Sequence, residues 1–384
     1  MNKKLAILGG GQLGRMLQQA AIPYPCELHF LDSSQAPIAQ VSPKLHKGNF
    51  RNTEDVLQFY HQTQADTISI EIEDVAITAL KQIEQDDTTT VMPHTSKLAT
   101  IQDKGLQKQL YNKLALPTAP FTLYQNKKEI EEDIQNHKLH FPFVQKLRKG
   151  GYDGRGVQVI RNATEMVSCF DAPSLVEEKA DIDKELAITI LRDAYGGKAL
   201  YPVAEMVFNE KANLVEYVLA PARIHNAQAE KIGEIAHKLV DDWNYIGILA
   251  IELFLNKDGS IWINEVAPRT HNSSHWTIEA CYSSQFDQQI RLMMGLPLGS
   301  TEMKTTYAAM INLLGDSDTQ KGTAHYHHLD KAYKLPGAQV HLYGKNEVRP
   351  YRKMGHITLV DDQLERLLQN AEDLFDSIKI NHHE

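Results

Sequence analysis

Two glutamates of the 384-residue chain, Glu252 and Glu265, lie at matching distances on either side of a predicted turn. Residues 246–255 and 261–266 are rich in Ile, Leu and Phe, and Asp258-Gly259 between such runs is typical of a β-hairpin. A two-residue turn there sets Glu252 opposite Glu265. Because side chains alternate along a strand, both carboxylates then share one face.

The two glutamates need a neutralising partner, because like charges directly opposite each other destabilise a sheet. The natural partner is a divalent cation held by carboxylate oxygens, usually together with nucleotide phosphates. The alternative is a solvated hairpin face that tolerates both acids. The polar residues that follow favour the cation, since Arg and His beside a metal–phosphate site suit an anionic intermediate. They are Asn264, Arg269, His271, Asn272 and His275.

A glycine-rich segment at residues 149–156 follows a predicted strand at 141–148 that carries Lys146. Such a loop can lay backbone N–H groups over phosphates, and a lysine on the preceding strand supplies a point charge for the same phosphates. A glycine-rich hairpin tip without a ligand is the alternative. The lysine just before the loop favours phosphate binding.

A second glycine-rich turn, residues 9–14, connects a strand to a helix, and the next strand ends at Asp32. This order is the fingerprint of dinucleotide binding, but the same unit is a scaffold in many α/β proteins that bind no dinucleotide. We expect the scaffold. A later strand runs into Glu71 and Glu73, either at the edge where open α/β sheets bind ligands or at a helix start that favours acids.

A basic stretch at residues 344–356 contains Lys345, Arg349, Arg352 and Lys353, although the net charge of the chain is −9. One interpretation is a solvated loop. The other is an anchor for a phosphorylated metabolite, because Arg and Lys both bind phosphate oxygens.

Composition places the chain among ordinary globular proteins. Its length predicts two or three domains, and hydrophobic and charged fractions of 42% and 23% exclude a disordered chain. The net charge of −9 argues against a nucleic-acid binder. The 3 cysteines form no CxxC pair, and neither a signal peptide nor a membrane span is expected. A reducing cytoplasm is therefore the expected location.

Strands and helices alternate along the chain, so the predicted fold class is α/β, in part α+β. The helices that the hydrophobic pattern and end signals predict are at residues 54–64, 79–85, 102–114, 227–243 and 284–295.

Together these motifs resemble the ATP-grasp superfamily, and within it most closely the N5-carboxyaminoimidazole ribonucleotide synthetase (PurK) family. The resemblance runs nearly end to end, and residues 264–279 are its most specific tract. The matching segments are residues 9–14, 71–73, 150–156, 264–272, 275–279, 343–345 and 349–356.

The resemblance implies an ATP-grasp fold in three domains. These are an N-terminal Rossmann-like (pre-ATP-grasp) domain at residues 1–100, an ATP-grasp domain at 101–298 and a small C-terminal β-rich domain at 299–384. The ATP-grasp domain would include a lid subdomain at about residues 117–180.

The implied reaction is the ATP- and bicarbonate-dependent carboxylation of 5-aminoimidazole ribonucleotide in purine biosynthesis. Bicarbonate attacks ATP to give carboxyphosphate and ADP, and the exocyclic amine then captures either carboxyphosphate or the carbon dioxide released from it, with phosphate as the other product. ATP is the co-substrate, and Mg²⁺ (or Mn²⁺) is the implied cofactor. The family pattern further implies a cytoplasmic homodimer whose partners are these small molecules, with no nucleic acid or membrane.

The resemblance also assigns roles by position. The implied ATP-binding residues are Lys104, Lys146, Gly151, Tyr152, Asp153, Gly154, Arg155, Gly156, Val157, Glu177, Glu178, Lys179, Ala180, Glu185, Phe208, Asn264 and Glu265. The implied metal ligands are Glu252 and Glu265, with Asn264 beside them. The implied catalytic residues are Arg269, His271, Asp153 and Lys353. The implied contacts to the aminoimidazole nucleotide are Glu73, Tyr152, Arg155, Lys345, Arg352 and Lys353.

Within that family pattern, the two lysines touch the ATP phosphates and residues 151–157 form a lid. Residues 177–180 form the adenine hinge, and Glu185 binds the ribose hydroxyls. Some positions depart from the pattern and put fine details of the nucleotide contacts in doubt: Asp74, Gln145, Leu147, Phe208, Thr270 and Ser274.

Three alternatives remain. Another ATP-grasp ligase, such as the formate-dependent glycinamide ribonucleotide transformylase or a D-alanine ligase, would share the nucleotide and metal residues. His275-Trp276 and the basic stretch favour the carboxylating enzyme over these ligases. An NAD-dependent dehydrogenase built on residues 9–14 leaves the acidic pair unexplained. A non-catalytic nucleotide sensor is disfavoured because both glutamates and both lysines are present.

Overall fold

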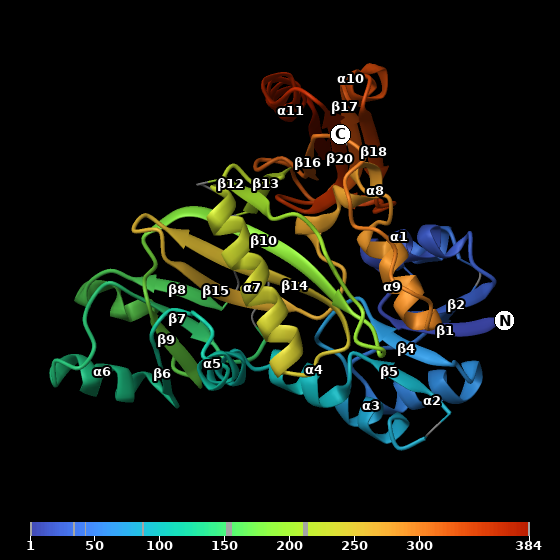
Figure 1. Ribbon diagram of the computed structural model, residues 1–384. Coiled ribbons are helices and arrows are strands. Elements are labelled where there is room, and N and C mark those ends of the chain that lie inside the picture. Colours follow the sequence, from blue (N-terminus) through green and yellow to red (C-terminus); the bar gives the residue numbers. More distant parts are fainter. Residues whose placement is uncertain are drawn as a thin grey trace.

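The computed structural model describes residues 2–33, 35–42, 44–86, 88–150, 156–209 and 214–382. Three parts surround a long central sheet (Figure 1). The N-terminal part lies at the lower right of the view, a small sheet with its helix lies at the lower left, and the C-terminal part lies at the top.

The N-terminal part is built on a parallel sheet of order β3-β2-β1-β4-β5. Its inner strands are buried along most of their length, as expected for strands covered on both faces. Its elements are β1 (Lys3–Leu8), α1 (Gln12–Ala21), β2 (Cys26–Asp32), η1 (Pro37–Gln40), β3 (Leu45–Lys47), α2 (Thr53–Thr63), β4 (Thr67–Ile70), α3 (Ile77–Ile83), β5 (Thr90–Met92) and α4 (Thr95–Ile101). The predicted glycine-rich turn and the acids after β4 therefore meet at the carboxyl edge of this sheet.

The small sheet at the lower left is antiparallel, with the order β6-β9-β7-β8. It packs α6 over a compact core that includes Ile130, Phe143 and Val176. The elements of this part are α5 (Lys104–Lys113), β6 (Phe121–Tyr124), α6 (Lys127–Gln135), β7 (Phe143–Leu147), β8 (Val157–Ile160), η2 (Ala163–Ser168) and β9 (Ser174–Glu178).

The central sheet has the order β15-β14-β10-β12-β13-β16-β20-β18, with β11 beside β10. Helix α7 covers one face through residues such as Ile235 and Leu239, while α9 packs between the other face and the N-terminal part. The elements of this stretch are β10 (Ile182–Arg192), β11 (Lys198–Leu200), β12 (Ala204–Asn209), β13 (Leu214–Ala220), α7 (Asn226–Asp242), β14 (Gly247–Asn256), β15 (Ile261–Ala267), η3 (Asn272–Ser274), α8 (Thr277–Ala280) and α9 (Gln285–Met294).

The C-terminal part continues the central sheet, because β16 pairs with β13 and β20 pairs with β16. Helix α11 closes a separate hydrophobic core over these strands through Leu367, Ala371 and Leu374. The elements here are β16 (Tyr307–Leu314), β17 (Gly322–His327), α10 (Leu329–Lys334), β18 (Ala338–Leu342), β19 (Glu347–Val348), β20 (Lys353–Asp361), α11 (Leu364–Ser377) and β21 (Lys379–His382).

The hairpin β14–β15 has the predicted pairing of the two glutamates but not the predicted turn. Glu252 lies opposite Glu265. Asn256 pairs with Ser260, so the loop consists of residues 257–259 and is one residue longer than expected. Gly259 in this loop adopts a φ of +83°. A β-bulge at Asn264 compensates for the extra residue and restores the register at the glutamates. The prediction of a two-residue turn is therefore wrong, and the prediction of the facing acids is confirmed.

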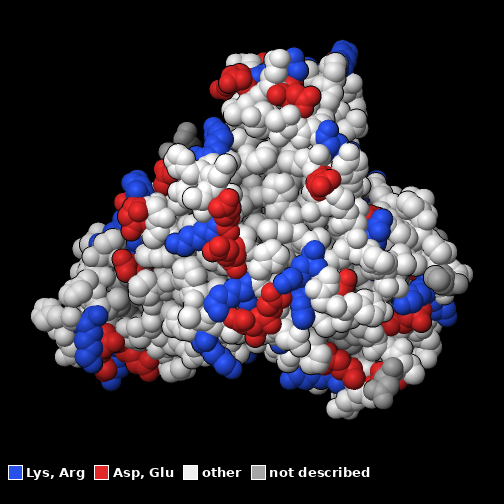
Figure 2. Space-filling view, in the orientation of Figure 1, with Lys and Arg blue, Asp and Glu red and all other residues white. Residues whose placement is uncertain are grey.

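No helix among the described residues is long and apolar enough to span a membrane. Figure 2 shows positive and negative side chains intermingled on the face that carries α7, without a large basic patch. That face offers no electrostatic footprint for nucleic acid.

The hairpin loop allows a test of the backbone geometry. Gly259 has a φ of +83° and an added Cβ would meet nothing within 4 Å, so Gly259→Ala introduces backbone strain alone. We expect it to lower the free energy of unfolding by about 1 kcal/mol in urea denaturation. Gly233 lies inside α7, where an added Cβ would make an ordinary 3.4 Å contact. Gly233→Ala should instead raise the free energy of unfolding by up to ~1 kcal/mol. Equal effects of the two substitutions would contradict the left-handed turn.

Candidate active site

The facing acids form one side of the candidate site. The Lys104 ammonium from α5 contacts the Glu265 carboxylate, and His271 Nε2 lies 3.6 Å from Glu252 Oε1. Burial and the charge of Glu265 raise the pKa of Glu252. Burial alone would also raise the pKa of Glu265, but the Lys104 ammonium more than offsets this effect, so the net pKa lies below the usual range. The arrangement favours cations beside the pair.

The acid pair fits a hard divalent cation only in part. Glu252, Glu265 and the Asn264 side chain offer oxygen donors, which Mg²⁺ prefers. Within the described ranges, no group of three or more His, Cys, Asp or Glu side chains is arranged to hold a metal ion. A magnesium ion on this pair would therefore need further oxygen ligands, of the kind that phosphates and water supply.

A buried ion triad lies next to the acid pair. Glu177 at the end of β9 contacts Lys146 of β7, and Lys108 Nζ lies 2.8 Å from its other carboxylate oxygen. Lys146 also donates to Asn264 Oδ1 at 2.8 Å, which connects the small sheet to β15. Burial would raise the pKa of Glu177, but the two lysines outweigh burial and lower the pKa. Two lysines around one carboxylate leave a surplus positive charge in this part of the site.

A small cavity of about 10 Å³ lies between these groups. Its lining consists of Lys104, Gln107, Lys108, Lys146, Leu175, Asn264 and Glu265. On the neighbouring strand β10, burial raises the pKa of Glu185 to about 7. The cavity itself admits no more than a water molecule. The lysines would therefore have to move from carboxylate oxygens to phosphate oxygens for a polyphosphate to bind here.

The N-terminal glycine-rich turn donates its N–H groups to carboxylates of the chain. Gly10 donates to Asp32 at 2.7 Å, and Gly11 and Gly14 donate to the two oxygens of Glu71. Burial raises the pKa of Glu71 to about 7 despite these donors. Because Asp32 and Glu71 already use these N–H groups, the geometry argues against the dinucleotide alternative.

The predicted phosphate anchor lies against this turn. Lys345 donates to Gln12 Oε1 at 2.8 Å and to the carbonyl oxygen of Lys353 at 2.6 Å. Burial, together with the charges of Arg352 and Lys353, lowers the pKa of Lys345 to about 7. A cluster of cations that suppress one another's protonation favours a bound anion.

Arg269 and His271 lie between the acid pair and this cationic cluster. Arg269 Nε lies 2.8 Å from Glu73 Oε1, which brings two predicted residues from different parts of the chain together. His271 Nδ1 lies 3.4 Å from the Ser273 main-chain nitrogen and 2.9 Å from Ser273 Oγ. The N–H donor favours the tautomer with the ring proton on Nε2, the nitrogen that faces Glu252. Burial lowers the pKa of His271 to about 3, with the charges of Arg269 and Lys353 adding to the shift. His271 is therefore a neutral hydrogen-bond donor at neutral pH.

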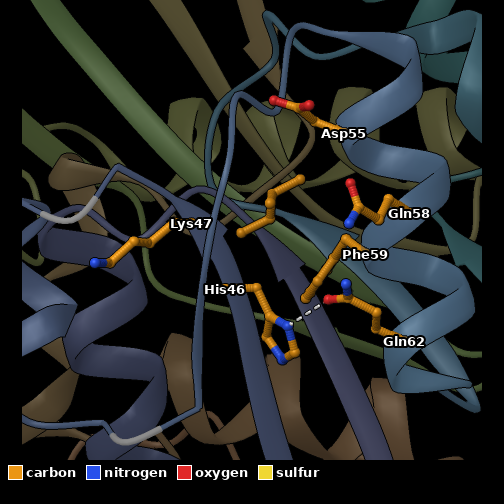
Figure 3. A pocket seen from close by; sticks show the side chains of 7 residues that line it. His46, Lys47, Asp55, Gln58, Phe59 and Gln62 are labelled. Carbon is orange, nitrogen blue, oxygen red and sulfur yellow. Dashed lines mark hydrogen bonds between the residues drawn. The ribbon is translucent and has the colours of Figure 1, made fainter.

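A larger cavity of about 100 Å³ lies elsewhere, between α2 and β3 (Figure 3). Two of its lining groups contact each other, since His46 Nδ1 lies 3.1 Å from Gln62 Oε1, and Asp55 accepts from the N–H of Asn49 beside the cavity. It is lined by Leu31, His46, Lys47, Asp55, Gln58, Phe59 and Gln62, none of them a predicted site residue.

Comparison with protein families accounts for nearly the whole chain. A family model described as the ribonucleotide synthetase preATP-grasp domain matches residues 1–102, and the ATP-grasp domain matches residues 109–286. The phosphoribosylaminoimidazole carboxylase C-terminal domain matches residues 308–370. The N5-carboxyaminoimidazole ribonucleotide synthase of Synechococcus elongatus is 37% identical over 92% of this chain and 89% of its own length. The chain belongs to the N5-carboxyaminoimidazole ribonucleotide synthase family.

Solved structures agree with this membership. The N5-carboxyaminoimidazole ribonucleotide synthetase of Thermotoga maritima is 37% identical, with a TM-score of 0.90 over 99% of this chain and 100% of that one. The synthase of Aspergillus clavatus, solved in complex with ADP and 5-aminoimidazole ribonucleotide, is 30% identical, with a TM-score of 0.86 over 98% of this chain and 99% of that one. The predicted ATP-grasp fold is confirmed.

Some relatives are longer than this chain. The chloroplastic phosphoribosylaminoimidazole carboxylase of Vigna aconitifolia is 36% identical over 95% of this chain, which spans only 65% of that protein.

The structure of this family member brings together predicted residues from all three parts of the chain. On the nucleotide side, Gly156 directly precedes Val157, the first residue of β8. Glu178 ends β9, Lys179 and Ala180 lie between β9 and β10, and Phe208 is half-buried on β12. Gly151, Tyr152, Asp153, Gly154 and Arg155 lie outside the described residues, so their predicted roles stay predictions. Sequence reasoning missed Lys108, although its position four residues after Lys104 on one helix face was a usable signal.

Glu71 gives a pH prediction. Its pKa is raised from 4.5 to about 7 in the folded chain, so between these values the folded state binds more protons than the unfolded state. Its contribution to the free energy of unfolding therefore falls as the pH rises from about 5 to about 7.5, by about 2 kcal/mol.

Glu71→Gln should flatten this part of the stability profile, measured by urea denaturation at both pH values. Glu372→Gln on the exposed face of α11 is the control and should leave the profile unchanged. If the stability of Glu71→Gln fell with pH as steeply as that of the wild type, the raised pKa of Glu71 would not be the cause of the pH dependence.

Proposed function

We propose that this chain catalyses the ATP- and bicarbonate-dependent carboxylation of 5-aminoimidazole ribonucleotide to N5-carboxyaminoimidazole ribonucleotide in purine biosynthesis. The observation that carries the proposal is the convergence of three groups of residues at one site. The lysines of α5 and β7 meet the acid pair of β14 and β15, and Arg269 and His271 connect that pair to the cationic cluster around Lys345.

In the first stage, a bicarbonate oxygen attacks the γ-phosphorus of ATP, and ADP leaves as the P–O bond to it breaks. Lys104 and Lys146 bind the phosphate oxygens and offset the negative charge of the transferring group. Glu252 and Glu265, with Asn264, would hold Mg²⁺ or Mn²⁺, which supplies further charge neutralisation and orients the phosphates. Ion pairs already present between lysines and glutamates keep these groups charged and in place.

In the second stage, the exocyclic amine attacks the carboxyl carbon of carboxyphosphate, and phosphate leaves. Arg269 offers a planar fork suited to the carboxylate, and His271, neutral with its proton on Nε2, can donate to a carboxyphosphate oxygen. Lys345, Arg352 and Lys353 anchor the 5′-phosphate of the ribonucleotide. Glu73, held by Arg269, faces the same nucleotide.

The remaining family expectations are part of the same proposal. ATP is the co-substrate, the substrates are small molecules, and the chain forms a homodimer in the cytoplasm. The predicted domain limits at residues 100 and 298 also stay predictions.

ADP release from MgATP tests the function directly, with bicarbonate and 5-aminoimidazole ribonucleotide each added or left out. We expect strong stimulation that requires both, with stoichiometric carboxylated product. Glu265→Gln should abolish the magnesium-dependent ADP release while the thermal unfolding midpoint is kept within a few degrees, because it removes one of two facing carboxylates. Stimulation by glycinamide ribonucleotide with formate instead would place the chain with another ATP-grasp ligase.

Lys353 tests the acceptor side. Lys353→Met should raise the KM for 5-aminoimidazole ribonucleotide by about tenfold or more with a smaller change in kcat, because a phosphate anchor contributes mostly uniform binding. Lys334→Met, at an exposed lysine of α10 in the same part of the chain, is the matched control and should leave both constants unchanged. An unchanged KM for the Lys353 variant would show that Lys353 does not bind the 5′-phosphate and would leave this role to the other cations of the cluster.

A further inference from the structure

The main chain of His271 is held by one buried side chain, Gln285 at the first position of α9. Gln285 Oε1 accepts from the His271 N–H at 2.7 Å, and Gln285 Nε2 donates to the His271 carbonyl oxygen at 2.8 Å. The second Nε2 hydrogen points to His275 Nδ1 at 2.9 Å. Gln285 has no exposed surface, and this one amide uses its oxygen and both of its hydrogens.

This contact lies where regular structure gives no support. Strand β15 ends at Ala267 and η3 begins at Asn272, so His271 lies in the irregular link between them. A peptide group in such a link needs partners from elsewhere, because it has no place in a helix or sheet ladder. The Ser274 N–H also donates to the His271 carbonyl oxygen, whereas Gln285 binds both sides of the His271 main chain.

The ring of His271 is fixed separately from its backbone. The Ser273 N–H donates to Nδ1, which leaves Nε2 directed at Glu252 at 3.6 Å. The ring keeps that direction only if the main chain of the link stays in place. The direction matters for the reaction, because a displacement of a reacting group by about 1 Å can lower the rate by about 100-fold.

We propose that Gln285 is a positioning residue for the carboxylation reaction, which holds the His271 main chain so that Nε2 faces the reacting groups beside Glu252. This inference rests on the proposed function. Gln285 does not touch the substrates and acts only through His271. Its loss should leave MgATP binding almost intact and misplace the group that faces carboxyphosphate, so that more ATP is hydrolysed without carboxylation.

The same helix offers a matched control. Gln288 is also fully buried, its Oε1 accepts from the Gly299 N–H at 2.9 Å, and its Nε2 donates to the Gly299 carbonyl oxygen at 2.7 Å. It makes the same paired contact to a main chain, but at a link that contains no predicted site residue. Gln→Met at each position removes the amide and keeps the length of the side chain, so the two variants lose comparable contacts.

The experiment compares Gln285→Met and Gln288→Met in the full chain. It measures the thermal unfolding midpoint, kcat, the KM for each substrate and the ratio of ADP released to carboxylated product. For Gln285→Met we expect kcat to fall by about tenfold or more and the ratio to rise above one, with the KM for MgATP within about twofold of wild type. Gln288→Met should keep kcat within about twofold and the ratio at one, even if its midpoint falls equally.

Two outcomes would overturn the inference. One is a Gln285→Met enzyme with the kcat and product ratio of the Gln288→Met enzyme. The other outcome concerns Gln285→Glu, which is used if Gln285→Met does not fold. This variant keeps the acceptor for the His271 N–H but loses the amide donors, so we expect a partial loss of kcat and a raised ratio of ADP to product. Wild-type values of kcat and of this ratio for Gln285→Glu would refute the positioning role. Failure of the wild type and Gln288→Met to carboxylate the ribonucleotide would instead refute the proposed function.

Discussion

The contact on which the nucleotide side of the site depends is the buried triad of Glu177, Lys108 and Lys146. A carboxylate with only 4% of its side chain exposed is tolerated only when cations and hydrogen bonds compensate for its lost hydration. The three residues come from β9, α5 and β7, so the pairing fixes the helix against the small sheet. Lys146 then connects that sheet to β15 through Asn264. Charged and polar contacts therefore connect the two sheets here.

The charges of this arrangement are matched to a polyphosphate. The triad holds two lysines for one carboxylate, and Lys104 supplies a third cation that contacts Glu265. Phosphate oxygens can bind Lys104 and Lys146 while Lys108 stays paired with Glu177, so no buried charge of the triad loses its partner. Such an exchange avoids the desolvation that binding to isolated buried charges would require. It also frees Glu265 for a divalent cation at the moment when phosphates arrive to complete its coordination.

Local sequence rules predicted the parts of the site that depend on neighbouring residues. The alternation of a strand predicted that Glu252 and Glu265 share a face, and helix α9 begins and ends within a residue or so of its predicted limits. The same rules failed on turn length, because a three-residue loop and a bulge at Asn264 shift the register by one residue in opposite directions and cancel.

The contacts that sequence reasoning could not supply are those between residues far apart in the chain. Nothing local to Lys345 indicates that it packs against Gln12 of the glycine-rich turn, and nothing local to Gln285 indicates a contact with His271. Amides in the buried face of a helix are nonetheless a signal, because a polar side chain without exposed surface must have partners. For Gln285 and Gln288 of α9 these partners are main-chain groups of the links on either side of the helix, at His271 and at Gly299, whereas Gln289 donates to Ser69 Oγ of β4. The helix therefore serves as a frame for two irregular links, and only one of them reaches the reacting groups.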